Sequence, residues 1–96
     1  MLDIIHQNTT QKIGAHSYFV DAVRENPKDL ESKVLAWGIY VVVPDMGIVI
    51  GGAYDSKEAA ILVFDAMVRC EETHVLCRLP ENDVEIINSF YSVHCK

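Results

Sequence analysis

The chain has 96 residues, of which 50% are hydrophobic and 23% are charged, and its formal net charge is −6. This composition is typical of one folded domain and excludes a disordered chain. The acidic balance argues against direct binding to nucleic acid or to an anionic membrane, because both require a clustered basic surface. Three cysteines in a chain that starts without a signal-peptide pattern predict reduced thiols in a cytoplasmic protein. No apolar run approaches the roughly 20 residues of a membrane helix.

The N-terminal part predicts short elements. Residues 2–5 favour a short edge strand, and residues 6–12 are polar and typical of a loop. Residues 15–23 then carry apolar side chains at helical spacing, namely Ala15, Phe19, Ala22 and Val23. We expect a helix there, although the β-propensity of the same residues leaves a strand open.

Asn26 and Pro27 end this element and, as N-cap and first helical residue, predict a short second helix. Its apolar face would consist of Leu30, Val34 and Trp37.

A β-hairpin is the clearest prediction of the chain. Residues 36–43 and 47–54 form two runs that contain no charged residue. The turn Pro44-Asp45-Met46-Gly47 joins them. The pair Gly51-Gly52 predicts either the end of the second strand or a bulge in it.

One long helix is expected over residues 56–71, because Asp55 and Glu58 have the spacing of a capping box. Its polar side chains fall on one narrow stripe, which consists of Glu58, Asp65, Arg69 and Glu72. Apolar side chains cover the remaining arc of roughly 260°, well beyond the width that an ordinary surface helix buries. Another helix or another molecule is therefore expected to cover part of this helix.

A further strand is expected over residues 73–79 and ends at Pro80. Asn82 or Asp83 then favours a last helix, whose apolar repeat consists of Val84, Ile87 and Tyr91. The predicted fold is a single compact α+β domain over residues 1–96. A small antiparallel sheet is built on the central hairpin, with one long helix and shorter N- and C-terminal helices.

Three cysteines and nearby histidines suggest metal chemistry as an alternative function. Cys70, His74, Cys77 and Cys95 are ligand types that zinc prefers, but their spacing lacks the usual Cys-x2–4-Cys knuckle. Free thiols that pack as small hydrophobic side chains explain these cysteines without a metal and are the favoured interpretation, and a thiol enzyme is a third one. No nucleophile, base and orienting group can be assigned together, so we predict no catalytic residues, no enzyme activity and no cofactor.

The hairpin followed by a capped helix, residues 48–60, resembles a unit found in many small proteins of phages and mobile elements. The resemblance implies a small acidic protein that acts by binding, as inhibitors of bacterial defence enzymes and toxin-immunity proteins do. We therefore predict a non-enzymatic protein-binding module, an inhibitor or regulator of a larger protein, with a homodimer as a further option. The predicted interface combines three side chains of the first hairpin strand with the polar stripe of the long helix, and consists of Trp37, Tyr40, Val42, Glu58, Asp65, Arg69 and Glu72.

Overall fold

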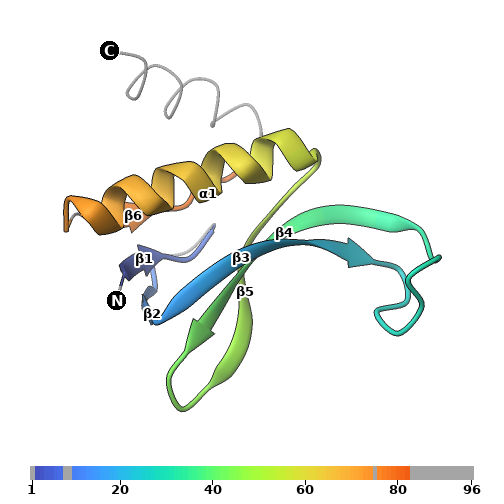
Figure 1. The fold of residues 1–96 in the computed structure, drawn as a ribbon, viewed down its shortest axis with the longest axis horizontal. Coiled ribbons are helices and arrows are strands. Elements are labelled where there is room, and N and C mark those ends of the chain that lie inside the picture. The colour runs from blue at the N-terminus through green and yellow to red at the C-terminus, as the bar shows by residue number, and fades with distance from the viewer. Residues whose placement is uncertain (1, 8–9, 75, 83–96) are drawn as a thin grey trace.

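The computed structural model describes residues 2–7, 10–74 and 76–82, and its strands form two three-stranded sheets (Figure 1). The first sheet has the order β2-β1-β6, with β1 at Leu2–Ile5, β2 at Lys12–Ala15 and β6 at Cys77–Arg78. The second has the order β3-β4-β5, with β3 at Ser17–Arg24, β4 at Val34–Val43 and β5 at Gly47–Tyr54. The α+β class predicted from the sequence is confirmed.

The hairpin of β4 and β5 is confirmed with nearly the predicted bounds. Pro44, Asp45 and Met46 form the turn, and the Met46 N–H donates to the Val43 carbonyl at 3.1 Å. Asp45 and Gly47 both have positive φ, at 72° and 87°, which an aspartate tolerates and a glycine adopts freely. This local chemistry fixes the register of the two apolar strands.

Gly51 is the bulge residue of β5. Ile39 lies opposite Gly52 and Tyr40 opposite Ile50, so Gly51 has no partner on β4. The bulge that Gly51-Gly52 predicted as one of two options is therefore present, and the strand continues beyond it.

Close packing explains why residue 51 is a glycine. A Cβ atom there would lie 3.2 Å from Leu79 Cδ1 and 3.3 Å from Ile4 Cδ1. Both neighbours belong to the region of the first sheet, so the missing side chain lets the two sheets approach each other at the bulge.

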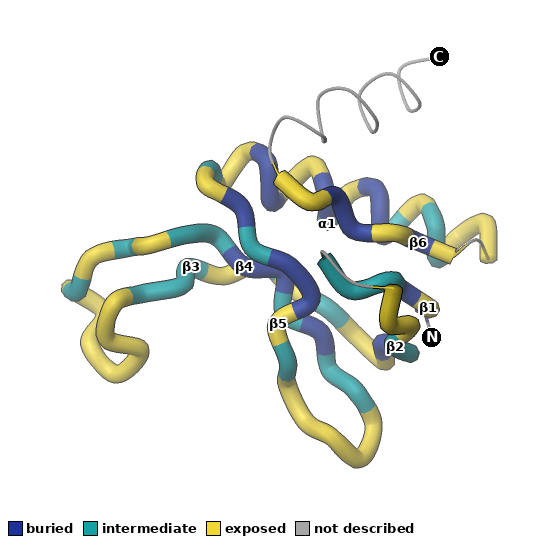
Figure 2. Tube along the Cα trace, turned by 180° about the vertical axis from the view of Figure 1, so that it is seen from behind, coloured by how far each residue is buried: buried dark blue, intermediate teal, exposed yellow. Residues whose placement is uncertain are grey.

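The long helix α1, Lys57–Glu72, covers strands of both sheets (Figure 1). Its N-cap is Ser56, whose Oγ accepts the Ala59 N–H at 3.1 Å, so the prediction of Asp55 as the cap is wrong by one residue. A serine hydroxyl satisfies a free amide of the first turn as well as a carboxylate does, and the backbone places Ser56 in position. The face turned to the sheets consists of Ala59, Ala60, Val63, Ala66 and Met67, and it is buried (Figure 2).

The helix predicted over residues 15–23 is wrong, because Ser17–Arg24 is strand β3 and pairs antiparallel with β4. Tyr18, Val20 and Ala22 alternate along this strand and turn one face toward α1, which uses the two-residue period that the same residues also contain.

The short helix predicted from Asn26 is also wrong. The segment 25–33 is a hydrogen-bonded loop in which the Ser32 hydroxyl donates to the carbonyls of Asn26 and Asp29. Val34 belongs to β4. Asn, Asp and Ser side chains compete with helical backbone bonds in this way.

The strand predicted over residues 73–79 is shorter than expected and lies in the other sheet. β6 covers Cys77–Arg78 and pairs parallel with β1, so the prediction of a single antiparallel sheet is wrong. β1 is consequently the middle strand of its sheet and not an edge strand. The predicted C-terminal helix falls on residues 83–96, outside the described residues.

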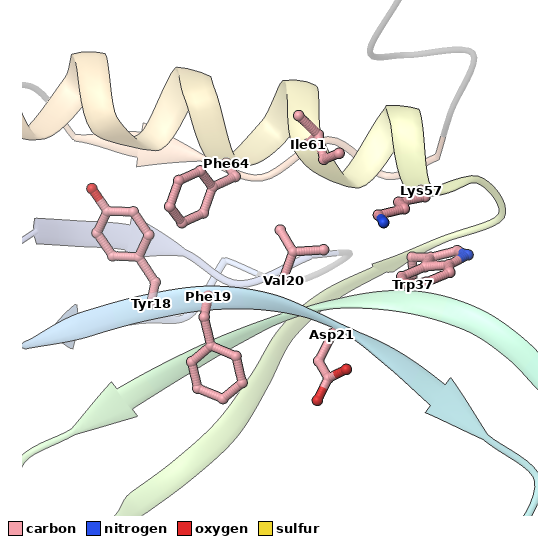
Figure 3. Close-up of a pocket in the computed structure, with 8 residues that line it drawn as sticks. All are labelled: Tyr18, Phe19, Val20, Asp21, Trp37, Lys57, Ile61 and Phe64. Carbon is pink, nitrogen blue, oxygen red and sulfur yellow. The ribbon is translucent and has the colours of Figure 1, made fainter. Parts of the chain in front are cut away.

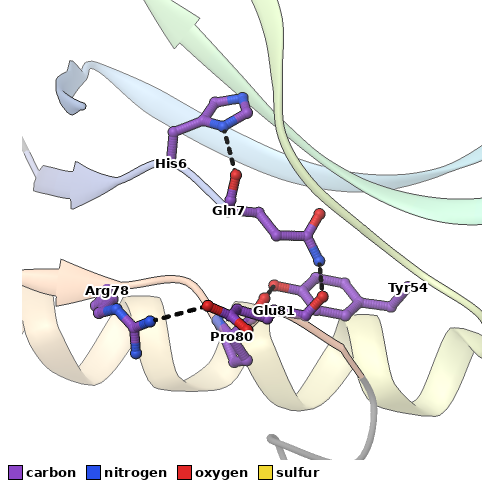
Figure 4. Close-up of polar contacts among 6 residues, drawn as sticks. All are labelled: His6, Gln7, Tyr54, Arg78, Pro80 and Glu81. Carbon is purple, nitrogen blue, oxygen red and sulfur yellow. Dashed lines mark hydrogen bonds and ion pairs between the residues drawn. The ribbon is translucent and has the colours of Figure 1, made fainter. Parts of the chain in front are cut away.

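Gln7 joins the two sheets at the end of β1. Its backbone N–H donates to the Gly51 carbonyl at 2.9 Å. Its side-chain Nε2 donates to the Ala53 carbonyl at 2.9 Å, and its Oε1 accepts the Ala53 N–H at 2.7 Å. The same Nε2 donates to the Glu81 carbonyl at 2.9 Å (Figure 4). Gln7 therefore occupies the outer edge of β5 as a neighbouring strand would.

Candidate protein-binding surfaces

The outer face of the β3-β4-β5 sheet, turned away from α1, is apolar and exposed. Opposite residues of neighbouring strands share a face, which places Phe19, Tyr40 and Ile50 in one row and Ile48 beside them. The Phe19 and Tyr40 rings are stacked with their centroids 5.3 Å apart. Phe19 is 39% exposed, Ile50 41% and Ile48 62%.

A groove of about 460 Å³ lies on this outer face. Leu30, 79% exposed, reaches its rim from the β3–β4 loop, and Arg24 and Asp21 supply its charges. Contiguous exposed apolar surface of this kind is uncommon on a chain that functions alone and marks surfaces that contact another molecule.

A second cleft, of about 470 Å³, lies between β3 and α1 (Figure 3). Lys57 Nζ lies over the Trp37 ring, 5.4 Å from its centroid, at one end of this cleft. Tyr18 and Phe64 meet edge to face at the other, with their centroids 5.3 Å apart. Ile61 lies between these two ends and is 41% exposed.

The phenol of Tyr18 is held neutral by its surroundings. Burial raises the pKa of Tyr18 to about 12, and the negative charge of Glu71 adds to the shift. The Tyr18 hydroxyl donates to the Glu71 carboxylate at 3.4 Å, which stabilises the protonated phenol further. This contact connects the start of β3 to the C-terminal end of α1.

The predicted interface residues lie on three separate surfaces. Tyr40 and Val42 lie on the outer face of the sheet, whereas Trp37 lies on the opposite face under Lys57. The polar stripe of α1 is exposed along its whole length and consists of Glu58, Asp65, Arg69 and Glu72. The structure therefore does not bring these residues together into one patch.

Phe19, Ile48 and Ile50 belong to the outer face and are missing from the predicted interface. Their signal was the two-residue alternation of β5 and β3, which places Ile48 and Ile50 on the face of Tyr40 and Val42. The helix predicted over residues 15–23 gave Phe19 no place on this sheet face.

The structure brings together two of the four proposed metal ligands. The Cys70 and Cys77 thiols are neighbours, and burial raises the pKa of Cys77, with a further contribution from the charge of Cys70 and a hydrogen bond to it. His74 is exposed at a left-handed backbone position, and Cys95 lies outside the described residues. No group of three or more metal-ligating side chains occurs in the part of the chain that the structure describes.

The described part of the chain has no helix with the length and apolarity needed to cross a bilayer. No protein-family model, curated protein or solved structure matches this chain. Function is therefore inferred from the surfaces described above.

Proposed function

We propose that this chain is a non-enzymatic protein-binding module that inhibits or regulates a larger protein through the outer face of its β3-β4-β5 sheet. The observation that carries the proposal is the cluster of exposed apolar side chains at Phe19, Ile48 and Ile50 on one face of the sheet. An apolar centre with polar residues around it is the anatomy of a protein interface.

The net charge supports a partner with basic residues around an apolar centre. The chain carries 14 acidic and 8 basic side chains. Complementary charge at the margin of an interface speeds association and excludes acidic competitors. The outer face itself is mostly apolar, so it suits a protein surface better than it suits a small polar ligand.

The test replaces Ile48, which is exposed on the outer face, by lysine. Proteins retained by the immobilised wild-type chain would be identified, produced separately and titrated calorimetrically against three variants. I48K alters the outer face, D65K alters the polar stripe of α1, and L76K alters an apolar residue that is 49% exposed outside both surfaces.

We expect I48K to weaken binding of the purified partner by more than about tenfold, because a lysine buried in the interface leaves its charge unpaired. L76K should bind as wild type does. A loss confined to D65K would assign the interface to the helix stripe instead. Equal binding by wild type and I48K, or no retained protein that binds once purified, would contradict the proposal.

A further inference from the structure

We propose that two copies of the chain pair antiparallel along β3 and form a two-fold symmetric dimer with one continuous six-stranded sheet. This inference does not rest on the proposed function, because it uses the edge of the sheet and one side of α1 and leaves the outer face open.

The free edge of β3 is prepared for such pairing. The Ala22 N–H points away from β4 and donates to the carboxylate of the preceding Asp21 at 2.8 Å. Alternation along an antiparallel pair turns the backbone groups of Tyr18 and Val20 to the same free edge. Among the described strands only β4 pairs with β3, whereas Gln7 occupies the opposite edge of the sheet. Gln7 covers that opposite edge only at Gly51 and Ala53, whereas the outer edge of β3 has no neighbouring strand along its whole length in the described structure.

One side of α1 faces β3 across the cleft between them and carries opposite charges at its two ends. Lys57, Ile61, Phe64, Val68 and Glu71 follow one another at spacings of three and four residues, which places them on one side of the helix. The central members are apolar, and the lysine and the glutamate stand seven residues before and seven after Phe64.

The contacts of these two charged residues relate the helix to the strand. Lys57 lies over Trp37, which is the β4 partner of Ala22. Glu71 accepts a hydrogen bond from Tyr18. The positive end of the helix side therefore lies near Ala22 and the negative end near Tyr18, with Val20 midway between them.

A two-fold axis through Val20, perpendicular to the sheet, satisfies both the free edge of β3 and the opposite charges at the two ends of the α1 side. It pairs Val20 with Val20 of the second copy and Tyr18 with its Ala22, which allows about six backbone hydrogen bonds. Asp21 releases the Ala22 N–H in this arrangement. The same axis turns the two α1 helices antiparallel, so that Lys57 of each copy faces Glu71 of the other and the exposed Ile61 side chains become covered.

The charges of Asp21, Lys57 and Glu71 favour this register over registers that are shifted along β3. An axis through Asp21 would place the two Asp21 carboxylates opposite each other, which is unfavourable. An axis displaced in either direction from Val20 also moves the Lys57 and Glu71 ends out of alignment. The occupant that fits this edge is thus a second copy of the chain, because its charge pattern is complementary to itself.

The experiment is sedimentation velocity of the full chain over a wide concentration series, for wild type, K57E, E71K and the double variant K57E/E71K. Within one copy, the two residues are 14 positions apart, or about 21 Å along the helix, so they do not form an ion pair there. Each single variant should raise the dimer dissociation constant about tenfold, since it replaces two symmetric ion pairs by like-charge contacts. The double variant should return to within about threefold of wild type.

Hydrogen exchange of the Val20 amide provides a second readout, because pairing protects this free-edge group only at concentrations where the dimer forms. A wild-type chain that stays monomeric throughout would leave the β3 edge to a strand of another protein and overturn the proposal. A dimer whose affinity is not restored by the double charge exchange would use another surface and would overturn it equally. Circular dichroism of all four proteins establishes that each is folded.

Discussion

The Gln7 side chain and the Ala53 backbone form a reciprocal pair of hydrogen bonds, 2.9 Å and 2.7 Å long, between residues 46 positions apart. A side-chain amide has the same donor and acceptor as a peptide group, so Gln7 continues the sheet by one residue without being part of a strand. The pair covers the edge of the β3-β4-β5 sheet at Ala53 and attaches it to the β2-β1-β6 sheet.

Replacing Gln7 by alanine should lower the free energy of unfolding by about 1–3 kcal/mol, because the Ala53 N–H and carbonyl lose their partners in a part-buried place. Urea denaturation monitored by circular dichroism measures the change. The control is Thr10→Ala, an exposed residue of the same loop, which should change stability by less than about 0.5 kcal/mol. Equal effects of the two substitutions would show that the amide pair contributes nothing.

The N-cap at Ser56 gives a second stability prediction. Ser56→Ala should cost about 1 kcal/mol, since the Ala59 N–H loses its acceptor, and Ser56→Asp should keep most of the stability. Thermal or urea unfolding measures both. If Ser56→Ala left the free energy of unfolding unchanged, the contact between Ser56 Oγ and the Ala59 N–H would not act as the helix cap.

Tyr18 predicts a loss of stability at alkaline pH. Burial and the Glu71 charge raise the pKa of Tyr18 from 10.0 to about 12. Between these pH values the unfolded phenol ionises while the folded one stays protonated, so the unfolded state binds fewer protons and stability falls as pH rises. Tyr18→Phe should show a smaller loss of stability between about pH 9 and pH 11, measured by urea unfolding.

A spectrophotometric titration of tyrosinate absorbance complements this test. The difference in absorbance between wild type and Tyr18→Phe should titrate at a higher pH than a free tyrosine does. Glu71→Gln should shift that titration toward lower pH, because it removes the negative charge beside the phenol. An unchanged titration in Glu71→Gln would contradict the contact between the two side chains.

The two described cysteines should differ in reactivity. Cys77 is buried and its pKa is raised by that burial, whereas Cys70 is half-buried. In a Cys95→Ser background at neutral pH, Cys70 should react with a thiol reagent and Cys77 should react about 100-fold more slowly than it does in urea, because only the exposed thiolate attacks. Fast labelling of native Cys77, located by peptide mass mapping, would contradict its burial and favour the thiol-enzyme reading.

The sequence predicted the elements whose signals are local. Residues 36–43 and 47–54 read as a hairpin because the turn residues and both apolar runs agree, and α1 was recognised by its cap spacing and its apolar arc. Residues 15–23 satisfied both a helical and a strand period, and pairing with β4 decided between them, which is a tertiary effect. The parallel pairing of β1 with β6 joins residues that are distant in sequence, so no local sequence pattern predicts it.

The surfaces were predicted less well than the elements. An excess of apolar residues indicated that some surface would stay open, and Tyr40 and Val42 do lie on the exposed outer face. Gln7 gave no signal, since a polar residue in a polar loop is ordinary, and its role depends on where the Ala53 backbone lies in space.

The two sheets differ in when they can be completed on the ribosome. β3, β4 and β5 are consecutive, so their meander can form once residue 54 has emerged. β1 precedes the other described strands in the chain but lies between β2 and β6, and β6 is the last strand of the described chain. β1 must therefore wait, with the backbone N–H and C=O groups of one edge unpaired, until Cys77 and Arg78 have left the exit tunnel.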